Sequence, residues 1–229
     1  AGNYTFTSTV GVTTVNANTQ GTVTFNGNVT GALVIQDTAT VAFAADDSIT
    51  GAITTDADGQ GTLTFATATA ATTLVSGNVG VATTGALLAT TVNTGAGITS
   101  TLGGQVNSDT ITVAGTGTLA ITGAVTATTT LDITGAATVT LAENLTTGVL
   151  DFNAVSTVTV AANKIITGNV DAGAAGQGTL TFAATTTDST LVSGSTGIVS
   201  NSLLAVNVAP ASGVTGTFYG CRCGDHGYE

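Results

Sequence analysis

The chain has 229 residues, including 31 glycines, and only 7% of its residues are charged, against roughly 25% in ordinary globular domains. Two basic residues stand against 13 acidic ones, so the formal net charge is −11. Two cations cannot neutralise a phosphate backbone or an anionic lipid surface, which argues against nucleic-acid binding and membrane-surface binding. Polar or glycine residues interrupt every apolar run well before it reaches the length of a membrane-spanning helix, so we expect no membrane insertion.

Short alternating segments follow one another from the N-terminus onward. They have the form Thr, apolar residue, Thr or Ala, apolar residue, except that the first has Ser8 in the fourth place. They begin at Thr5, Thr22, Thr40, Thr62, Thr110, Thr118, Thr138, Thr157 and Thr179. Alternation with a period of two predicts strands that point their apolar residues to one face and their threonines to the other. Strong helix formers are almost absent, so no helix is expected across the body of the chain.

The body of the chain is a tandem duplication of about 116 residues. Residues 49–77 and 166–194 are identical at 18 of 29 aligned positions, with a constant offset of 117. The match extends upstream, where residues 31–35 align with 148–152. It also extends downstream, where 87–104 align with 203–220 after a one-residue deletion. Repeats of this kind indicate an architecture built from stacked units.

Short strands, separated by small-residue corners at intervals of about 20 residues, predict an all-β parallel β-solenoid, or β-helix, of roughly 11 coils. We expect the solenoid over residues 1–220, with a first half at about 22–104 and a second half at about 138–220. Linking coils would occupy 105–137. A β-sandwich and a pair of similar β-domains are the alternative folds.

Outward threonines are the most specific surface feature. If the units align on one face, they form two columns of hydroxyl and methyl groups about 7 Å apart, repeating every 4.8 Å or so. The candidate array consists of Thr22, Thr24, Thr62, Thr64, Thr138, Thr140, Thr157, Thr159, Thr179 and Thr181. Such a surface is similar to that of ice-binding β-solenoids. The spacing is irregular, however, and no unit is expected in strand register between residues 64 and 110. Threonine also suits any exposed strand position.

Acidic pairs are candidates for calcium at a corner of the solenoid. Asp46 lies beside Asp47, and Asp56 lies close to Asp58. Carboxylate oxygens suffice as calcium ligands, but the second half carries Asn163 and Lys164 where the first has Asp46 and Asp47. We therefore expect solvated turns at these positions, with no cofactor. Nothing in the chain pairs acids with the cations or aromatic platforms of a glycosidase or lyase, so we expect no enzyme.

The last nine residues, 221–229, differ from the rest of the chain. They contain Cys221, Cys223 and His226, which are weak candidates for metal ligands because their spacing matches no standard zinc module. By the duplication they should resemble residues 105–113, and they do not. A cap, a junction to another module or residues foreign to the chain are the other interpretations.

Several phrases occur in both halves, among them GlyGlnGlyThrLeuThrPheAla at 59–66 and 176–183 and ThrLeuValSerGly at 73–77 and 190–194. In these phrases the chain resembles the repetitive passenger regions of rickettsial-type surface antigens and related bacterial autotransporter adhesins. That resemblance implies a secreted, elongated rod that adheres to a host or neighbouring cell surface. A start at Ala1 without Met also fits a mature exported protein. Self-association into a filament or surface layer is the alternative, and ice binding is a third.

Overall fold

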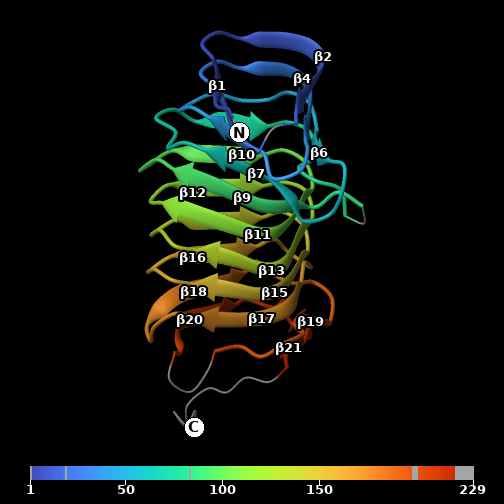
Figure 1. Ribbon diagram of the computed structural model, residues 1–229. Coiled ribbons are helices and arrows are strands. Elements are labelled where there is room, and N and C mark those ends of the chain that lie inside the picture. The colour runs from blue at the N-terminus through green and yellow to red at the C-terminus, as the bar shows by residue number, and fades with distance from the viewer. Residues whose placement is uncertain (1, 19, 83, 198–200, 220–229) are drawn as a thin grey trace.

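The computed structural model describes residues 2–18, 20–82, 84–197 and 201–219. Within these residues the chain forms strands and turns without a helix, and its paired strands run parallel, stacked coil upon coil (Figure 1). The predicted all-β parallel β-solenoid is therefore confirmed. Among these residues there is no helix with the length and hydropathy that crossing a membrane requires.

The described strands form three sheets. The largest contains β1 (Tyr4–Phe6), β3 (Thr22–Phe25), β5 (Thr40–Phe43), β7 (Gln60–Phe65), β9 (Leu87–Thr94), β11 (Val106–Gly115), β13 (Val125–Ile133), β15 (Leu145–Phe152), β17 (Ile166–Ala172), β19 (Ser189–Val192) and β21 (Gly216–Phe218), in that order. A seven-stranded sheet contains β8 (Thr72–Val75), β10 (Thr99–Leu102), β12 (Thr118–Ile121), β14 (Thr138–Leu141), β16 (Thr157–Val160), β18 (Gln177–Phe182) and β20 (Leu203–Val208). The third sheet contains β2 (Val10–Ala17), β4 (Val29–Ile35) and β6 (Ile53–Thr55).

Strand pairing aligns the inward side chains in three columns along the solenoid axis. The first column is Phe6, Phe25, Phe43, Phe65, Val92, Val113, Ile133, Phe152 and Ala172. The second is Val10, Val29, Ile49, Val75, Leu102, Ile121, Leu141, Val160, Phe182 and Val208. The third is Val15, Leu33, Ile53, Val79, Val106, Val125, Leu145, Ile166, Val192 and Phe218. Each coil is thus three-sided, and its core is continuous.

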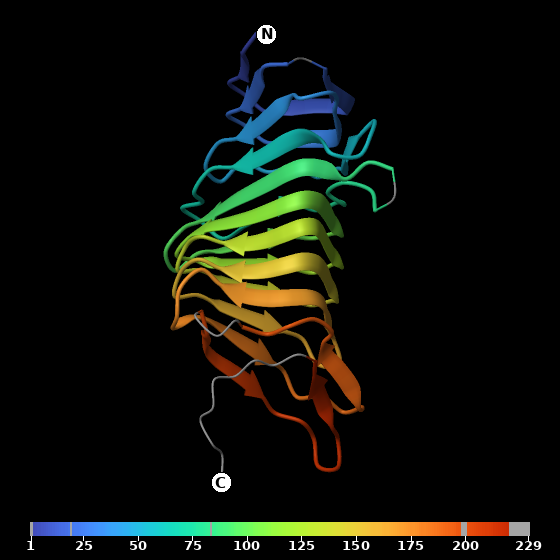
Figure 2. The ribbon, with the colours of Figure 1, turned by 60° about the horizontal axis from the view of Figure 1, so that its bottom comes forward.

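Over the residues that the structure describes, the solenoid has about nine coils, not the roughly 11 expected from the sequence. The coils differ in length: along the first column, the step from Phe25 to Phe43 is the shortest and the step from Phe65 to Val92 is the longest. The expected number was too high because the corners between strands are longer in some coils than in others. With strands about 4.8 Å apart, nine coils give a rod roughly 40 Å long, with β1 and β2 at one end and β20 and β21 at the other (Figure 2).

The predicted inward and outward faces are confirmed. Phe25, Leu63, Phe65 and Leu180 are fully buried, whereas the threonines that alternate with them are half-buried. At one end of the first column Phe6, Phe25, Phe43 and Phe65 form a ladder of stacked rings with centroids 5.0 to 5.2 Å apart. Offset-stacked aromatic rings contribute about 0.5 to 1.5 kcal/mol per pair beyond the area that they bury.

The two halves are rotated relative to each other by one side of the coil. Phe65 lies in the first column and its duplicate, Phe182, in the second. Counting along the first column, Ala172 is five coils beyond Phe65, and Phe182 lies on the next side after Ala172. Val75 in the second column and its duplicate, Val192, in the third show the same shift. One repeat therefore spans five coils and a third of a turn.

Gly61 and Gly178 show why the phrase GlyGlnGlyThrLeuThrPhe occurs in both halves. Their φ angles are +70° and +72°, in the left-handed region that residues with a side chain rarely adopt. A Cβ at Gly61 would lie 2.6 Å from Ile35, and one at Gly178 would lie 2.3 Å from Phe152. The backbone at the second residue of β7 and of β18 therefore requires glycine both for its conformation and for the space beside the core.

Candidate interaction surfaces

The ten threonines of the candidate array lie on two different sides of the rod. Thr22, Thr24, Thr62 and Thr64 belong to the eleven-stranded sheet. Thr138, Thr140, Thr157, Thr159, Thr179 and Thr181 belong to the seven-stranded sheet. The expected single array is thus divided, because the duplication spans five coils and a third of a turn. All ten side chains are half-buried, since neighbouring coils flank each of them.

The threonines of the seven-stranded sheet nevertheless form a regular array. Strand pairing places Thr99, Thr118, Thr138, Thr157 and Thr179 in one outward row. Thr101, Ala120, Thr140, Thr159 and Thr181 form the row beside it. Nine of these ten positions are threonine. The unit at Thr99 and Thr101 was missed in the sequence because the inward residue between them is Ser100, which is fully buried and breaks the apolar alternation.

Asp46 holds a corner of the solenoid together. It has a φ of 65°, and its Oδ1 accepts hydrogen bonds from the backbone N–H groups of Thr69 (2.7 Å) and Ala70 (2.9 Å) of the next coil; its Oδ2 accepts one from the Thr69 hydroxyl. The hydroxyl bond first, and then the two amide bonds, hold the pKa of Asp46 below its ordinary value. Burial, and then the charge of Asp46, raise the pKa of Asp47.

The same corner recurs in the second half with an amide in place of the carboxylate. Asn163, the counterpart of Asp46, has a φ of 60°, and its Oδ1 accepts a hydrogen bond from the Thr186 N–H at 2.8 Å. In the sequence these positions look different because their charges differ. The structure shows that the repeat preserves an acceptor at a left-handed corner, which either Asp or Asn supplies.

Asp56 and Asp58 also make hydrogen bonds between coils. The Asp58 Oδ1 accepts from the Ala86 N–H at 2.9 Å, and the Asp56 Oδ2 accepts from the Gln36 Nε2 at 3.5 Å. No group of three or more metal-ligating acids, histidines or cysteines occurs among the residues that the structure describes. Residues 221–229, with the metal candidates Cys221, Cys223 and His226, lie outside them.

A column of three carboxylates lies on the outer face of the eleven-stranded sheet. Asp132 pairs with Asp151, which pairs with Asp171, so that like charges lie on adjacent coils. Asn153 Nδ2 donates to both Asp132 Oδ1 and Asp151 Oδ2 at 2.9 Å. These acids are a full coil apart in sequence, and only the register of the coils brings them together. Lys164, in a different part of the rod, forms an ion pair with Glu143 at 2.6 Å.

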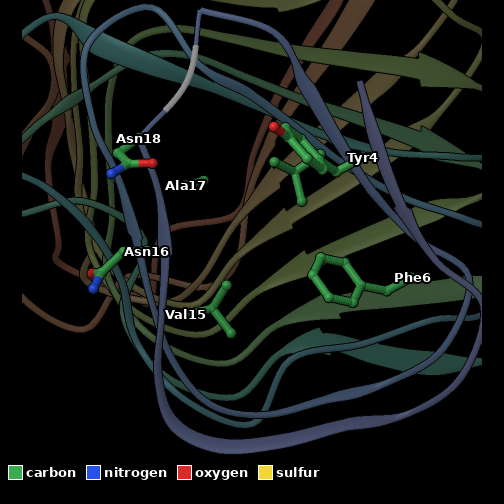
Figure 3. A pocket seen from close by; sticks show the side chains of 7 residues that line it. Tyr4, Phe6, Val15, Asn16, Ala17 and Asn18 are labelled. Carbon is green, nitrogen blue, oxygen red and sulfur yellow. The ribbon is translucent and has the colours of Figure 1, made fainter. Parts of the chain in front are cut away.

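The end of the rod that carries β1 and β2 leaves the top of the core open. Tyr4, Phe6, Val15, Asn16, Ala17, Asn18 and Val23 line a hollow there, and Phe6 and Val15 face each other across it (Figure 3). Tyr4 is 60% exposed and Phe6 is 41% exposed, although Phe6 stacks on the fully buried Phe25. This end therefore presents apolar surface and a strand edge without a neighbour among the described residues, and none of the described side chains that line its hollow is charged.

Scans of protein-family models, of curated proteins and of solved structures each found no match to the chain. The interpretation of the surfaces therefore depends on their own geometry.

Proposed function

We propose that the chain is a secreted, cell-surface structural rod that acts through its shape, by self-association or by adhesion to another cell surface, without catalysis. The observation that carries the proposal is the unbroken triple column of apolar side chains. The inward side chains of the described coils pack into this core and make the rod rigid. The outward hydroxyl rows and the two ends are then the surfaces that can contact a partner. The resemblance to autotransporter passenger regions supports the extracellular location and the adhesive role.

Charge supports self-association of the rod. The net charge of −11 comes from carboxylates spread along a rod of roughly 40 Å, and physiological salt screens exposed charges beyond about 8 Å. Repulsion between two rods is therefore weak in salt, whereas apolar contacts at their open ends remain. Identical units that meet head to tail form a contact that repeats without closing, so filaments are the expected product.

Sedimentation velocity of the purified chain, over a range of salt and protein concentrations, tests this proposal, and electron microscopy of the same samples shows the form of any assembly. We expect elongated oligomers that grow with both variables. A monomer under every condition would contradict self-association and leave adhesion, which would then be measured as binding of the labelled monomer to cell surfaces. The absence of both self-association and binding to cell surfaces would overturn the proposal.

Ice binding is a second candidate, and the regular threonine array of the seven-stranded sheet favours it. Rows of hydroxyl and methyl groups about 7 Å apart, repeating every 4.8 Å or so, form a flat and regular surface. Inhibition of ice recrystallisation would test it. We expect Thr159→Lys, in the middle of the array, to abolish such activity, and Thr64→Lys, on the other sheet, to preserve it.

A further inference from the structure

The two ends of the rod carry the two outermost strands of one sheet. β1 begins the described eleven-stranded sheet and β21 ends it, so each has one edge without a neighbouring strand among the described residues. Phe6 C=O accepts a hydrogen bond from the Asn26 N–H at 2.8 Å. Successive residues of a parallel strand bond alternately to its two neighbours, so the backbone groups of Thr5 face the open edge.

Both edge strands have counterparts inside the molecule that hold the equivalent place in the stack of strands. β1 corresponds to β12: Phe6 pairs with Phe25 as Ile121 pairs with Leu141, and Thr5 pairs with Thr24 as Ala120 pairs with Thr140. β21 corresponds to β10. Its residues Gly216, Thr217 and Phe218 pair with β19 in the register, including the irregular step, in which Ser100, Thr101 and Leu102 pair with β8.

These internal counterparts pair with each other. β10 and β12 are adjacent parallel strands with Leu102 opposite Ile121; β10 ends the first half of the duplication and β12 lies in the coil that follows it. The Thr122 N–H donates to Leu102 C=O at 3.0 Å, and the Thr118 N–H donates to Ile98 C=O at 2.8 Å. The molecule therefore contains a junction of the kind that β21 and β1 would form if they met.

We propose that β21 of one copy pairs in parallel with β1 of a second copy, in the register of the β10–β12 junction, and so joins rods end to end. This inference rests on the self-association proposed above and specifies its contact. The occupant of the open β1 edge is thus a second copy of this chain. Continuity with the internal junction, rather than exposure alone, identifies it.

The side chains of the two strands suit this register. Phe218 would lie over Phe6 and extend the ladder of stacked rings across the junction. Gly216 would lie opposite Tyr4, whose side chain is 60% exposed, and would leave room for it. The Thr7 N–H would donate to the Phe218 C=O, as Thr122 does to Leu102. Neither strand carries a charge or a proline, the usual means by which proteins protect a sheet edge.

The proposal concerns these two strands alone. β2 corresponds to β13, and β13 pairs with β11, whose counterpart in the second half falls after residue 219, outside the described residues. β20 corresponds to β9, which also pairs with β11. The contact between β1 and β21 is therefore the part of the internal junction that can be compared residue by residue.

Designed cysteines test the register. In a background with Cys221→Ser and Cys223→Ser, Thr5→Cys and Thr217→Cys would lie opposite each other across the junction. Their Cα atoms would be about 4.8 Å apart, within the range of a disulfide. The matched control is Thr24→Cys with Thr217→Cys. It moves one cysteine a coil inward, about 10 Å from its partner and beyond that range. Because β1 and β21 lie at opposite ends of the rod (Figure 2), any disulfide between residues 5 and 217 joins two molecules.

We expect mild oxidation to convert the first variant into a ladder of covalent dimers, trimers and longer chains on a non-reducing gel, and to leave at least tenfold more of the control as monomer. Sedimentation before oxidation separates the two proposals. If the rods associate but neither pair cross-links, or both do so equally, the end-to-end junction is wrong and self-association through other surfaces stands. If the rods remain monomeric and no ladder forms, both the junction and self-association are overturned.

Discussion

Replacing Phe43 by alanine measures what the stacked aromatic rings contribute to the rod. Phe43 is 1% exposed and stacks on both neighbours in the first column, with ring centroids 5.2 Å from Phe25 and 5.0 Å from Phe65. Its interplanar angles with them are 22° and 16°. It is an interior ring of the ladder, so its removal interrupts two stacked pairs and leaves a cavity.

The expected loss has two parts. Truncation of a buried phenylalanine costs about 3 to 5 kcal/mol through lost transfer energy and the cavity. Two stacked pairs add roughly 1 to 3 kcal/mol. Phe152 is the matched control: it is fully buried in the same column, but its neighbours there are Ile133 and Ala172. Phe43→Ala should therefore cost roughly 1 to 3 kcal/mol more than Phe152→Ala.

Urea unfolding followed by far-UV circular dichroism gives the loss in free energy of unfolding for Phe43→Ala and for Phe152→Ala. Stacked repeats need not unfold as one unit, so hydrogen exchange at the amides of β5 and β15 should accompany it as a local measure. Phe43→Leu, which keeps most of the volume and loses the ring, should fall between wild type and Phe43→Ala. An equal cost at Phe43 and Phe152 would show that the rings act as ordinary apolar filler and that stacking adds nothing.

The remaining predictions concern the outer faces. Thr181→Ala should cost under about 1 kcal/mol, because the side chain is half-buried and outward, and urea unfolding will measure it. Because the pKa of Asp46 is lowered in the folded state, its carboxylate stabilises the corner at pH values above its ordinary pKa of 3.8. This stabilisation is lost as the pH falls through the lowered pKa of the folded state. Hydrogen exchange should therefore show acid-sensitive protection at the Thr69 amide but not at Thr186, and Asp46→Asn should remove the difference. Asp151→Asn should stabilise the rod by roughly 0.5 kcal/mol in thermal unfolding, because it removes the middle charge of the column and with it the repulsion from Asp132 and Asp171 on the adjacent coils; added salt should reduce this gain.

Local features of the fold were predictable from the sequence because they depend on neighbouring residues. Alternation within ThrLeuThrPhe at 62–65 is enough to place Leu63 and Phe65 inside and the two threonines outside. The duplication could be recognised in the sequence for the same reason. A position such as Gly61 tolerates few other residues, so the phrase around it occurs in both halves.

Features that depend on the length of each coil were not predictable. The coils range from the short one between Phe25 and Phe43 to the long one between Phe65 and Val92, and a single long corner changes which residues lie above one another. This is why the predicted number of coils was too high and why the threonine array is divided between two sheets. The column of Asp132, Asp151 and Asp171 has the same origin, since no local pattern marks residues that meet only through register.

The rotation of one side per repeat bears on what the duplication can serve. Had the repeat spanned whole coils, Thr64 and Thr181 would lie on the same face, and every further repeat would lengthen one array of hydroxyls. A third of a turn moves the array to the next side of the rod instead. The rotation does not disturb the core, because any apolar side chain can continue a column. The second column passes from Leu102, at the end of the first half, to Ile121 in the next coil without a gap. Duplication thus extends the rod but no single face of it. A function that depends on length and on the two ends tolerates that outcome, whereas one that depends on a continuous flat array does not, and for this reason we place structural self-association or adhesion before ice binding.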